Sequence, residues 1–291
     1  MVFGTSGQML TADARRAAVL GSPIAHSLSP ALHEAAYRAL GLTHWSYETH
    51  EVRAVALRGF VAALGPEWVG LSLTMPLKEA AFEVADEVSD LAREVGAINT
   101  LVRRPDGGWR GDNTDVYGVS QALRGAGAGP VASSMVLGSG ATARSVVAAL
   151  AALGCPKVTF AVRSVARPQT VAQARRAGLE VEVVGLGQLA SRVGETPLVI
   201  STLPADALSA SALADLVLPS GSRLPDHLLL DVVYAGWPSP LARVFLDAGA
   251  SVVSGFEVLV HQGAEQVHLM TGLLAPVEQM RAAGLAAMGS P

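Results

Sequence analysis

The sequence predicts an α/β fold made of two lobes, each built on a mainly parallel sheet covered by helices. The first observation is that short apolar runs alternate with Ala-rich amphipathic segments, which is typical of strand–helix–strand units. The second is that this alternation occurs twice, once before about residue 115 and once after it. The third is a glycine-rich turn at residues 138–143, where the second series begins.

The first series predicts three strand–helix pairs followed by a hairpin. The expected strands are residues 16–21, 43–52 and 68–76, and the expected helices are residues 30–41, 56–65 and 77–96. The turn-rich residues 105–109 predict a hairpin that leads into residues 110–115. We expect the first dozen residues to form a loose extension.

The second series predicts a Rossmann-type lobe. Its expected strands are residues 133–138, 157–162, 181–185, 197–204 and 228–234, and its expected helices are residues 141–154 and 172–178. A helix over residues 115–127 enters this lobe, and the last two expected helices, residues 257–272 and 276–289, pack back on the first lobe. The predicted domains are residues 1–114 plus 255–291 and residues 115–254.

Composition limits the function of such a chain. Its 291 residues are 50% apolar and 16% charged, which suffices for two cores. A net charge of -4 gives no electrostatic sign of nucleic acid or membrane binding, and no apolar run is long enough to span a membrane. The single cysteine, Cys155, cannot form an internal disulfide, and no Cys or His spacing resembles a metal site. We expect a cytoplasmic protein without a metal, and the sequence leaves a homodimer open.

The glycine-rich turn predicts a dinucleotide site. Gly138, Gly140 and Ala143 form a G-x-G-x-x-A pattern between an expected strand and helix. The first glycine permits a tight turn, the second lets a pyrophosphate approach the backbone, and the small third residue lets helix and strand pack closely. The helix N-terminus then supplies N–H groups for the phosphates. An ordinary strand-to-helix turn is the alternative.

The strand that follows ends in two arginines, which favours NADP over NAD. Arg163 and Arg167 occupy the turn, with Ser164 between them, where NAD-binding versions usually carry an acidic residue for the ribose hydroxyl. Guanidinium groups bind a 2′-phosphate with paired hydrogen bonds. The alternative is a pair of ordinary surface arginines.

A lysine after a buried strand indicates acid/base chemistry. Only two of the 21 basic residues are lysines, Lys78 and Lys157, so arginine is the usual cation of this chain. Lysine differs from arginine in that it can lose its proton when desolvated. A solvated residue that opens a helix is the alternative explanation for Lys78.

Two serines in the first lobe predict an anion site. Ser27 and Ser29 precede a helix opened by Pro30, so hydroxyls and free N–H groups converge there. Simple helix capping by Ser29 is the alternative.

The only two asparagines, Asn99 and Asn113, are each followed by threonine, and their scarcity indicates specific hydrogen bonding. A pair of Asx turns is the alternative. Asp115, at the boundary of the two series, is suited to hold Lys78 or a substrate hydroxyl, and helix capping is equally consistent with its local sequence.

Seven blocks of this sequence resemble the shikimate dehydrogenase family in order and spacing. Along the chain they are GSPIAHSLSP, LTMPLKEAA, GAINTL, GDNTD, the glycine loop, DVVY and HQGAEQ. They extend over nearly the whole chain after the N-terminal extension. One block would be weak evidence, whereas seven in order are highly specific.

The resemblance implies NADP-dependent, reversible reduction of 3-dehydroshikimate to shikimate, a step of aromatic amino acid biosynthesis. The family's catalytic lysine and aspartate match Lys78 and Asp115. The positions implied to bind substrate are Ser27, Ser29, Thr74, Asn99, Asp115, Tyr234 and Gln262. The expected cofactor site consists of Gly138, Ser139, Gly140, Ala141, Thr142, Arg163, Ser164, Arg167, Val232 and Gly255.

Some positions depart from the family pattern. Ser72 and Ser201 stand where asparagine is usual, Ala141 where a glycine is frequent, and Val162 where an N-R-T block usually begins. A quinate or dual quinate/shikimate dehydrogenase is the nearest alternative, and the serine pair favours shikimate. A non-catalytic shikimate or nucleotide sensor is the second alternative, which an intact Lys78 and Asp115 disfavour. An unrelated methyltransferase leaves the first lobe unexplained.

Overall fold

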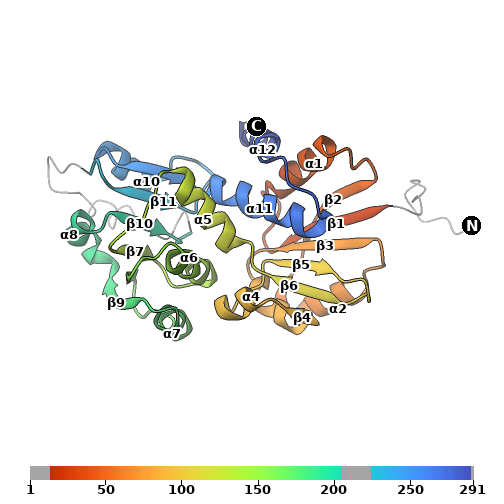
Figure 1. The fold of residues 1–291 in the computed structure, drawn as a ribbon, viewed down its shortest axis with the longest axis horizontal. Helices are drawn as coiled ribbons and strands as arrows, with labels where there is room; N and C mark the ends of the chain where they lie inside the picture. The colour runs from red at the N-terminus through yellow and green to blue at the C-terminus, as the bar shows by residue number, and fades with distance from the viewer. Residues whose placement is uncertain (1–13, 205–206, 208–223, 290–291) are drawn as a thin grey trace, which may run out of the picture.

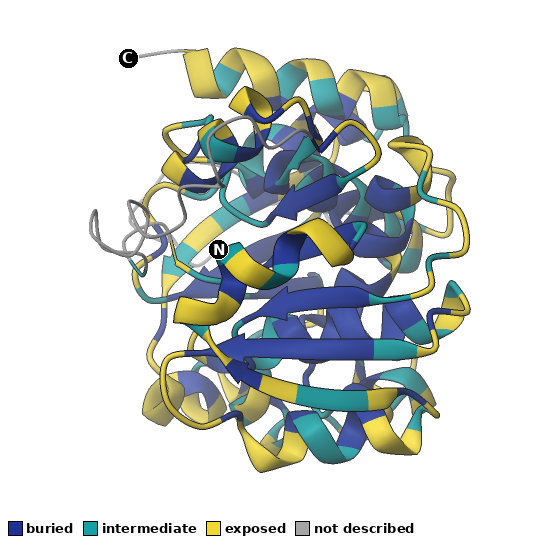
Figure 2. Cartoon of the chain, turned by 90° about the vertical axis from the view of Figure 1, so that its left-hand side faces the viewer, coloured by how far each residue is buried: buried dark blue, intermediate teal, exposed yellow. Residues whose placement is uncertain are grey.

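The computed structural model describes residues 14–204, 207 and 224–289, and the expected N-terminal extension lies outside them. Two lobes lie side by side, each with a six-stranded sheet between helices (Figure 1). Figure 2 shows the strands largely buried and the outward faces of the surrounding helices exposed. No helix that can be followed in these residues has the length and apolar character needed to cross a membrane.

The first sheet is mixed and has the strand order β2-β1-β3-β5-β6-β4. Its strands are β1 (Arg15–Gly21), β2 (Trp45–Glu51), β3 (Trp68–Leu73), β4 (Glu87–Val88), β5 (Thr100–Arg103) and β6 (Trp109–Asp112). β1 pairs in parallel with β2 and β3, whereas β5 is antiparallel to both β3 and β6. The predicted hairpin is therefore present. Helices α1 (Ser29–Ala39) and α2 (Leu57–Ala62) belong to the same lobe.

The prediction of a single helix over residues 77–96 is wrong. The segment consists of α3 (Leu77–Ala80), a 3₁₀ turn at Ala81–Glu83, strand β4 and α4 (Asp90–Val95). β4 pairs with β6, and the Ser89 hydroxyl starts the new helix by accepting a hydrogen bond from the backbone N–H of Ala92 at 3.1 Å. Strand pairing and this cap outweigh the helical periodicity of the segment. Lys78 consequently lies on one short helical turn.

The second sheet is entirely parallel, with the order β12-β11-β10-β7-β8-β9. Its strands are β7 (Ser134–Leu137), β8 (Lys157–Val162), β9 (Glu180–Gly185), β10 (Leu198–Ser201), β11 (Leu228–Asp231) and β12 (Ser251–Ser254). Helices α6 (Ala141–Ala152), α7 (Pro168–Arg176), α8 (Leu189–Arg192) and α10 (Pro240–Asp247) connect them. The sequence pattern missed α10 and β12, and β12 is short and only partly buried.

Helices α5 (Asp115–Gly125) and α11 (Gly255–Thr271) join the lobes, and the last described helix, α12 (Val277–Gly289), lies on the first lobe (Figure 1). α5 packs against α11 so closely that a Cβ on Gly118 would lie 2.7 Å from the Val258 carbonyl oxygen. α12 packs on α1. The prediction that the C-terminal helices pack back on the first lobe is confirmed.

Candidate active site

A pocket of about 350 Å³ lies between the two lobes. On the first lobe its wall comes from β1, β3, the start of α1 and the segments that follow the two strands. The rest comes from α5, α6, α11 and the segment after β11. The sequence-predicted residues that line it are Ser27, Ser29, Thr74, Lys78, Asp115, Thr142, Val232, Tyr234, Gly255 and Gln262. Residues far apart in the sequence are therefore brought to one cavity.

Lys78 and Asp115 form an ion pair at the wall of this pocket. The Lys78 Nζ atom donates a hydrogen bond to Asp115 Oδ2 at 2.6 Å, and the two side chains are 16% and 12% exposed. Asp115 begins α5, whose N-cap residue is Thr114, so Asp115 does not cap this helix. An amine beside a carboxylate at the wall of a pocket is suited to proton transfer with a bound molecule.

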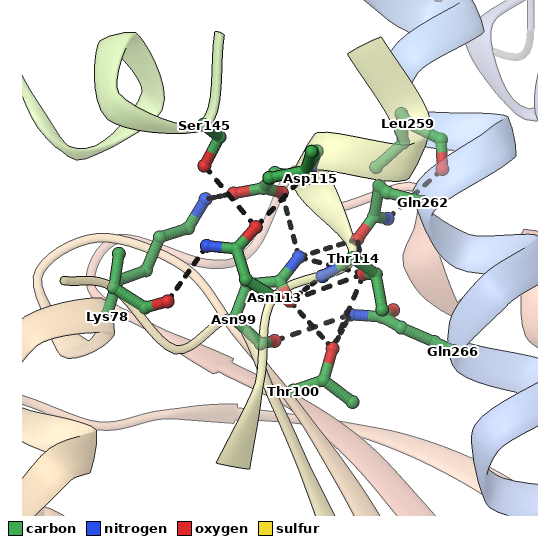
Figure 3. Close-up of polar contacts among 12 residues, drawn as sticks. Lys78, Asn99, Thr100, Asn113, Thr114, Asp115, Ser145, Leu259, Gln262 and Gln266 are labelled. Atoms are coloured by element: carbon green, nitrogen blue, oxygen red, sulfur yellow. Dashed lines mark hydrogen bonds and ion pairs between the residues drawn. The ribbon is translucent and has the colours of Figure 1, made fainter. Parts of the chain in front are cut away.

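Asn99 binds the carboxylate of Asp115 on the side away from the pocket. Its Nδ2 atom donates to Asp115 Oδ1 at 2.8 Å and lies 3.3 Å from Gln262 Oε1, and its Oδ1 atom accepts from the Thr114 backbone at 2.8 Å (Figure 3). Asn99 is 1% exposed and is not among the residues that line the pocket. Its amide is thus engaged with protein groups, whereas Gln262 faces the cavity.

Asn113 joins the lobes instead of facing the pocket. Its Nδ2 atom donates to the Ala97 carbonyl at 2.8 Å, and its Oδ1 atom accepts from the Ser145 hydroxyl and the Val116 N–H, both at 3.3 Å. The bond to Val116 is local but reaches three residues on, whereas the Asx turn that the sequence left open as an alternative reaches two.

The serine pair lies at the start of α1. Leu28 is the N-cap residue and makes no side-chain cap, so Ser29 does not cap this helix. The Ser27 Oγ atom accepts from the Ser29 backbone N–H at 3.3 Å. Tyr234 faces the same pocket, and burial raises the pKa of its hydroxyl. Neutral hydroxyl donors gathered in this way can bind an anion without a cation.

A buried polar network that the sequence pattern did not indicate underlies the pocket. The Tyr47 hydroxyl donates to Ser72 Oγ at 2.6 Å, and Ser72 donates to Gln266 Oε1 at 2.8 Å. The His33 Nε2 atom lies 3.3 Å from the same oxygen, and its ring stacks on Tyr47 with 4.0 Å between centroids. Burial lowers the pKa of His33 to about 3, so this ring is neutral near pH 7. The available signal was Gln266, which follows Gln262 by four residues and shares its helix face.

The predicted glycine loop has the geometry that a dinucleotide needs. Gly138 has φ +98°, and a Cβ there would lie 2.8 Å from Thr202 Oγ1, so the turn requires glycine. A Cβ on Gly140 would meet nothing within 4 Å, which leaves the backbone approachable. Gly140 is the N-cap residue of α6 and supplies no side-chain acceptor to the N–H groups of the first turn.

The other predicted cofactor residues lie around this loop. The Ser139 Oγ atom accepts from the Arg167 backbone at 3.1 Å, which ties the loop to the start of α7. Arg163 and Ser164 are exposed beyond β8, and none of these residues lines the pocket itself. Gly255 approaches the segment after β11 so closely that a Cβ would lie 2.0 Å from the Val232 carbonyl oxygen. The residues present therefore fit a dinucleotide.

Comparisons with known proteins agree with this arrangement. Residues 19–101 match the family model of the shikimate dehydrogenase substrate binding domain, and residues 255–283 match that of the shikimate 5'-dehydrogenase C-terminal domain. A curated relative from Synechococcus sp. (strain JA-3-3Ab), named shikimate dehydrogenase (NADP(+)), is 36% identical over 287 residues, which cover 94% of this chain and 95% of the relative.

Two solved structures extend the comparison to the fold. Mycobacterium tuberculosis shikimate dehydrogenase is 44% identical with a TM-score of 0.83, and the match covers 94% of this chain and 99% of that one. The Thermus thermophilus enzyme, solved in complex with NADP(H) and shikimate, is 34% identical with a TM-score of 0.78 and the same coverage. The chain described here therefore belongs to the shikimate dehydrogenase family.

Proposed function

We propose that this protein is an NADP-dependent oxidoreductase that interconverts 3-dehydroshikimate and shikimate in aromatic amino acid biosynthesis. The observation that carries the proposal is the ion pair between Lys78 and Asp115 at the wall of a pocket that also contains hydroxyl and amide groups. The 36% identity to a relative named for this NADP-dependent activity supports the same substrate and cofactor.

In this proposal the substrate carboxylate binds at the serine pair. Ser27, Ser29 and Tyr234 donate hydrogen bonds to it, and their clustering at the pocket supports this role. Thr74, Gln262 and Asp115 hold the ring hydroxyls, while Asn99 acts on them through Asp115 and Gln262. Hydroxyl and amide donors suffice for one carboxylate, which explains how a chain with a net charge of -4 binds an anionic substrate.

Proton transfer is assigned to Lys78. Bound NADP would supply the hydride chemistry, with the oxidised form as acceptor for shikimate and the reduced form as donor for 3-dehydroshikimate. During reduction, the Lys78 ammonium gives its proton to the substrate carbonyl oxygen, so the C=O group becomes CH–OH. In the oxidative direction the Lys78 amine takes the hydroxyl proton. Asp115 holds Nζ at 2.6 Å, and Asn99 fixes Asp115, so the amine is already oriented.

The glycine loop and the arginines are assigned to the cofactor. The backbone from Gly138 to Thr142 at the start of α6 binds the pyrophosphate, and Arg163, Ser164 and Arg167 bind the 2′-phosphate. Val232 and Gly255, which line the pocket together with Thr142, lie at the nicotinamide end.

Domain limits, compartment and assembly are part of the proposal. We assign residues 1–114 plus 255–291 to substrate binding and residues 115–254 to NADP binding, because every strand of the first sheet precedes Asp115 and every strand of the second falls between Ser134 and Ser254. A single cysteine suits the reducing cytoplasm. A homodimer is the assembly to test by sedimentation.

A spectrophotometric assay of the reduced nicotinamide tests the function. Shikimate and quinate are each combined with NADP and with NAD, and kcat/KM is measured for all four pairs. The proposal expects shikimate with NADP to be the best pair by about tenfold or more. A preference for quinate would replace the substrate assignment, and no turnover in any pair would overturn the function.

A further inference from the structure

Arg144 crosses from the second lobe to the first in a way that the assigned activity does not explain. Arg144 lies in the first turn of α6 and is only 3% exposed. Its Nε atom donates to the Val95 carbonyl at 2.7 Å, and its Nη2 atom donates to the Gly96 carbonyl at 2.9 Å and to Glu79 Oε1 at 2.7 Å. All three acceptors belong to the first lobe, close to Lys78.

These acceptors suit a buried cation. Val95 and Gly96 end α4, where carbonyl groups lack partners within the helix and carry partial negative charge. The half-exposed carboxylate of Glu79 supplies the opposite full charge. Separating the lobes would break these three charge-assisted hydrogen bonds and expose the guanidinium to water. The contact therefore favours one arrangement of α6 against the first lobe.

The same contact fixes the segment that carries Lys78. Glu79 directly follows Lys78 on α3, and the Lys78 carbonyl accepts from the Ile98 backbone at 2.8 Å. A second link runs in parallel, because the Ser145 hydroxyl on α6 donates to Asn113, which in turn binds the Ala97 carbonyl. α6, which begins at the glycine loop, thus contacts both α3, which carries Lys78, and the segment after α4, which binds the Lys78 backbone through Ile98.

We propose that Arg144 and Glu79 form a latch through which α6 positions Lys78 for proton transfer. The inference rests on the proposed function, and it makes Arg144 a positioning residue that acts through Glu79 and does not touch the substrate. Glu79 also faces Arg167, whose Nη1 atom lies 3.9 Å from the same oxygen. The carboxylate next to Lys78 is therefore shared by two arginines of the cofactor-binding lobe.

The test compares Arg144→Met, Arg144→Lys and Glu79→Gln with the wild type. Arg144→Met removes every bond of the latch, and we expect kcat to fall by about ten- to a hundredfold, the scale of a displaced reacting group. Lysine can reach one partner but cannot reproduce the guanidinium fork, so Arg144→Lys should recover part of that loss. Glu79→Gln keeps an acceptor and should cost about threefold or more in kcat. Glu83→Gln is the matched control, since its exposed carboxylate lies 3.9 Å from the exposed Arg58 of the same lobe.

Hydrogen exchange gives a readout that does not depend on turnover. In Arg144→Met we expect the backbone amides of residues 77–83 and Ile98 to exchange faster, and in Glu83→Gln we expect no change there. In the double variant of Arg144→Met and Glu79→Gln, the fold-decrease in kcat should be smaller than the product of the fold-decreases in the two single variants.

The latch would be overturned if Arg144→Met kept kcat within about twofold of the wild type at saturating substrate, or if the two losses simply multiplied. If Arg144→Met fails to fold, unchanged kcat in both Arg144→Lys and Glu79→Gln would equally overturn the latch. Lack of activity of the wild type on both substrates would overturn the proposed function. The latch would be rejected separately, by hydrogen exchange in Arg144→Met that does not differ from the wild type.

Discussion

The substrate end of the site, at the pocket, and its cofactor end, at the glycine loop beside the pocket, are built from different parts of the chain. At the substrate end, side chains bind one another: Lys78, Asp115, Asn99 and Gln262 are joined by hydrogen bonds and are largely buried. At the cofactor end the backbone dominates. Gly140 faces open space, the first turn of α6 has no side-chain cap, and Arg163 and Arg167 are exposed.

This difference separates two kinds of effect. The side chains of the substrate end hold one another in place by hydrogen bonds, and such preorganisation is the condition under which a side chain contributes to the rate of a chemical step. The cofactor end offers unpaired donors that a bound phosphate would satisfy. Changes at the first end should therefore alter kcat or the substrate KM, and changes at the second should alter cofactor affinity.

The largest effect is expected at Lys78. Lys78→Ala removes the proton donor and acceptor, and we expect kcat to fall by about a hundredfold or more, with a smaller change in the KM for shikimate. Steady-state kinetics with saturating NADP measure both constants. Lys157→Ala is the control, because the other lysine pairs with Glu180 and Glu182 on the edge of the second lobe, away from the pocket. Near-normal kcat in Lys78→Ala would remove this residue from the mechanism.

The cofactor end should respond in affinity alone. Arg163→Ala is expected to weaken NADP binding by at least about tenfold and leave NAD nearly unchanged, because a charge-assisted hydrogen bond contributes about 1.5 to 3 kcal/mol and NAD lacks the 2′-phosphate. Arg163→Asp should go further, since a carboxylate repels the phosphate and can accept from the ribose hydroxyl of NAD.

The measurement for Arg163 is kcat/KM for both cofactors at saturating shikimate. Arg175→Ala, an exposed arginine in the last turn of α7, is the control. Equal losses for NADP and NAD would mean that Arg163 supports the fold or the shared part of the dinucleotide.

The cofactor end was the more predictable of the two. Gly138 and Gly140 lie close together in the sequence, and their spacing alone specifies a turn with positive φ and an open approach. The parallel second sheet followed in the same way from alternating segments, although the short β12 gave too weak a pattern.

The substrate end depends on contacts that no local pattern contains. Tyr47, Ser72 and Gln266 meet only after three separate elements have packed. The break in the helix expected over residues 77–96 depends on pairing between β4 and β6, which tertiary structure imposes on a helical sequence pattern. Arg144 likewise gave no signal, because a cation in an amphipathic helix is ordinarily exposed.

The neutral His33 beneath the substrate end predicts a pH dependence of stability. The folded state lowers the pKa of this ring from 6.5 to about 3, so between these values the unfolded state binds a proton that the folded state does not. Between pH 6.5 and about 3, the free energy of unfolding should fall by about 1.4 kcal/mol for each pH unit on account of this residue. The contribution of the neutral His33 to stability is fully present above pH 6.5 and is lost as the pH falls toward 3.

Urea denaturation at several pH values measures this slope. His33→Gln keeps a donor for Gln266 and removes the titration, so its slope should be smaller by about that amount, whereas the exposed His44→Gln should keep the wild-type slope. Equal slopes in His33→Gln and the wild type would show that His33 does not remain neutral in the fold.

The smallest effect is expected at Ser27, where the substrate end meets the anion. Ser27→Ala removes one neutral hydroxyl from the proposed carboxylate site and the acceptor of the Ser29 N–H. A hydrogen bond of this kind contributes about 0.5 to 1.5 kcal/mol, and it acts equally on ground and transition states, so the KM for shikimate should rise about two- to tenfold while kcat stays. Ser22→Ala is the control, since this serine lies on the same connection but its hydroxyl binds Glu51 at 2.9 Å. A fall in kcat with unchanged KM would instead assign Ser27 to the chemical step, and the division between a prearranged reacting pair and a separate carboxylate site would have to be abandoned.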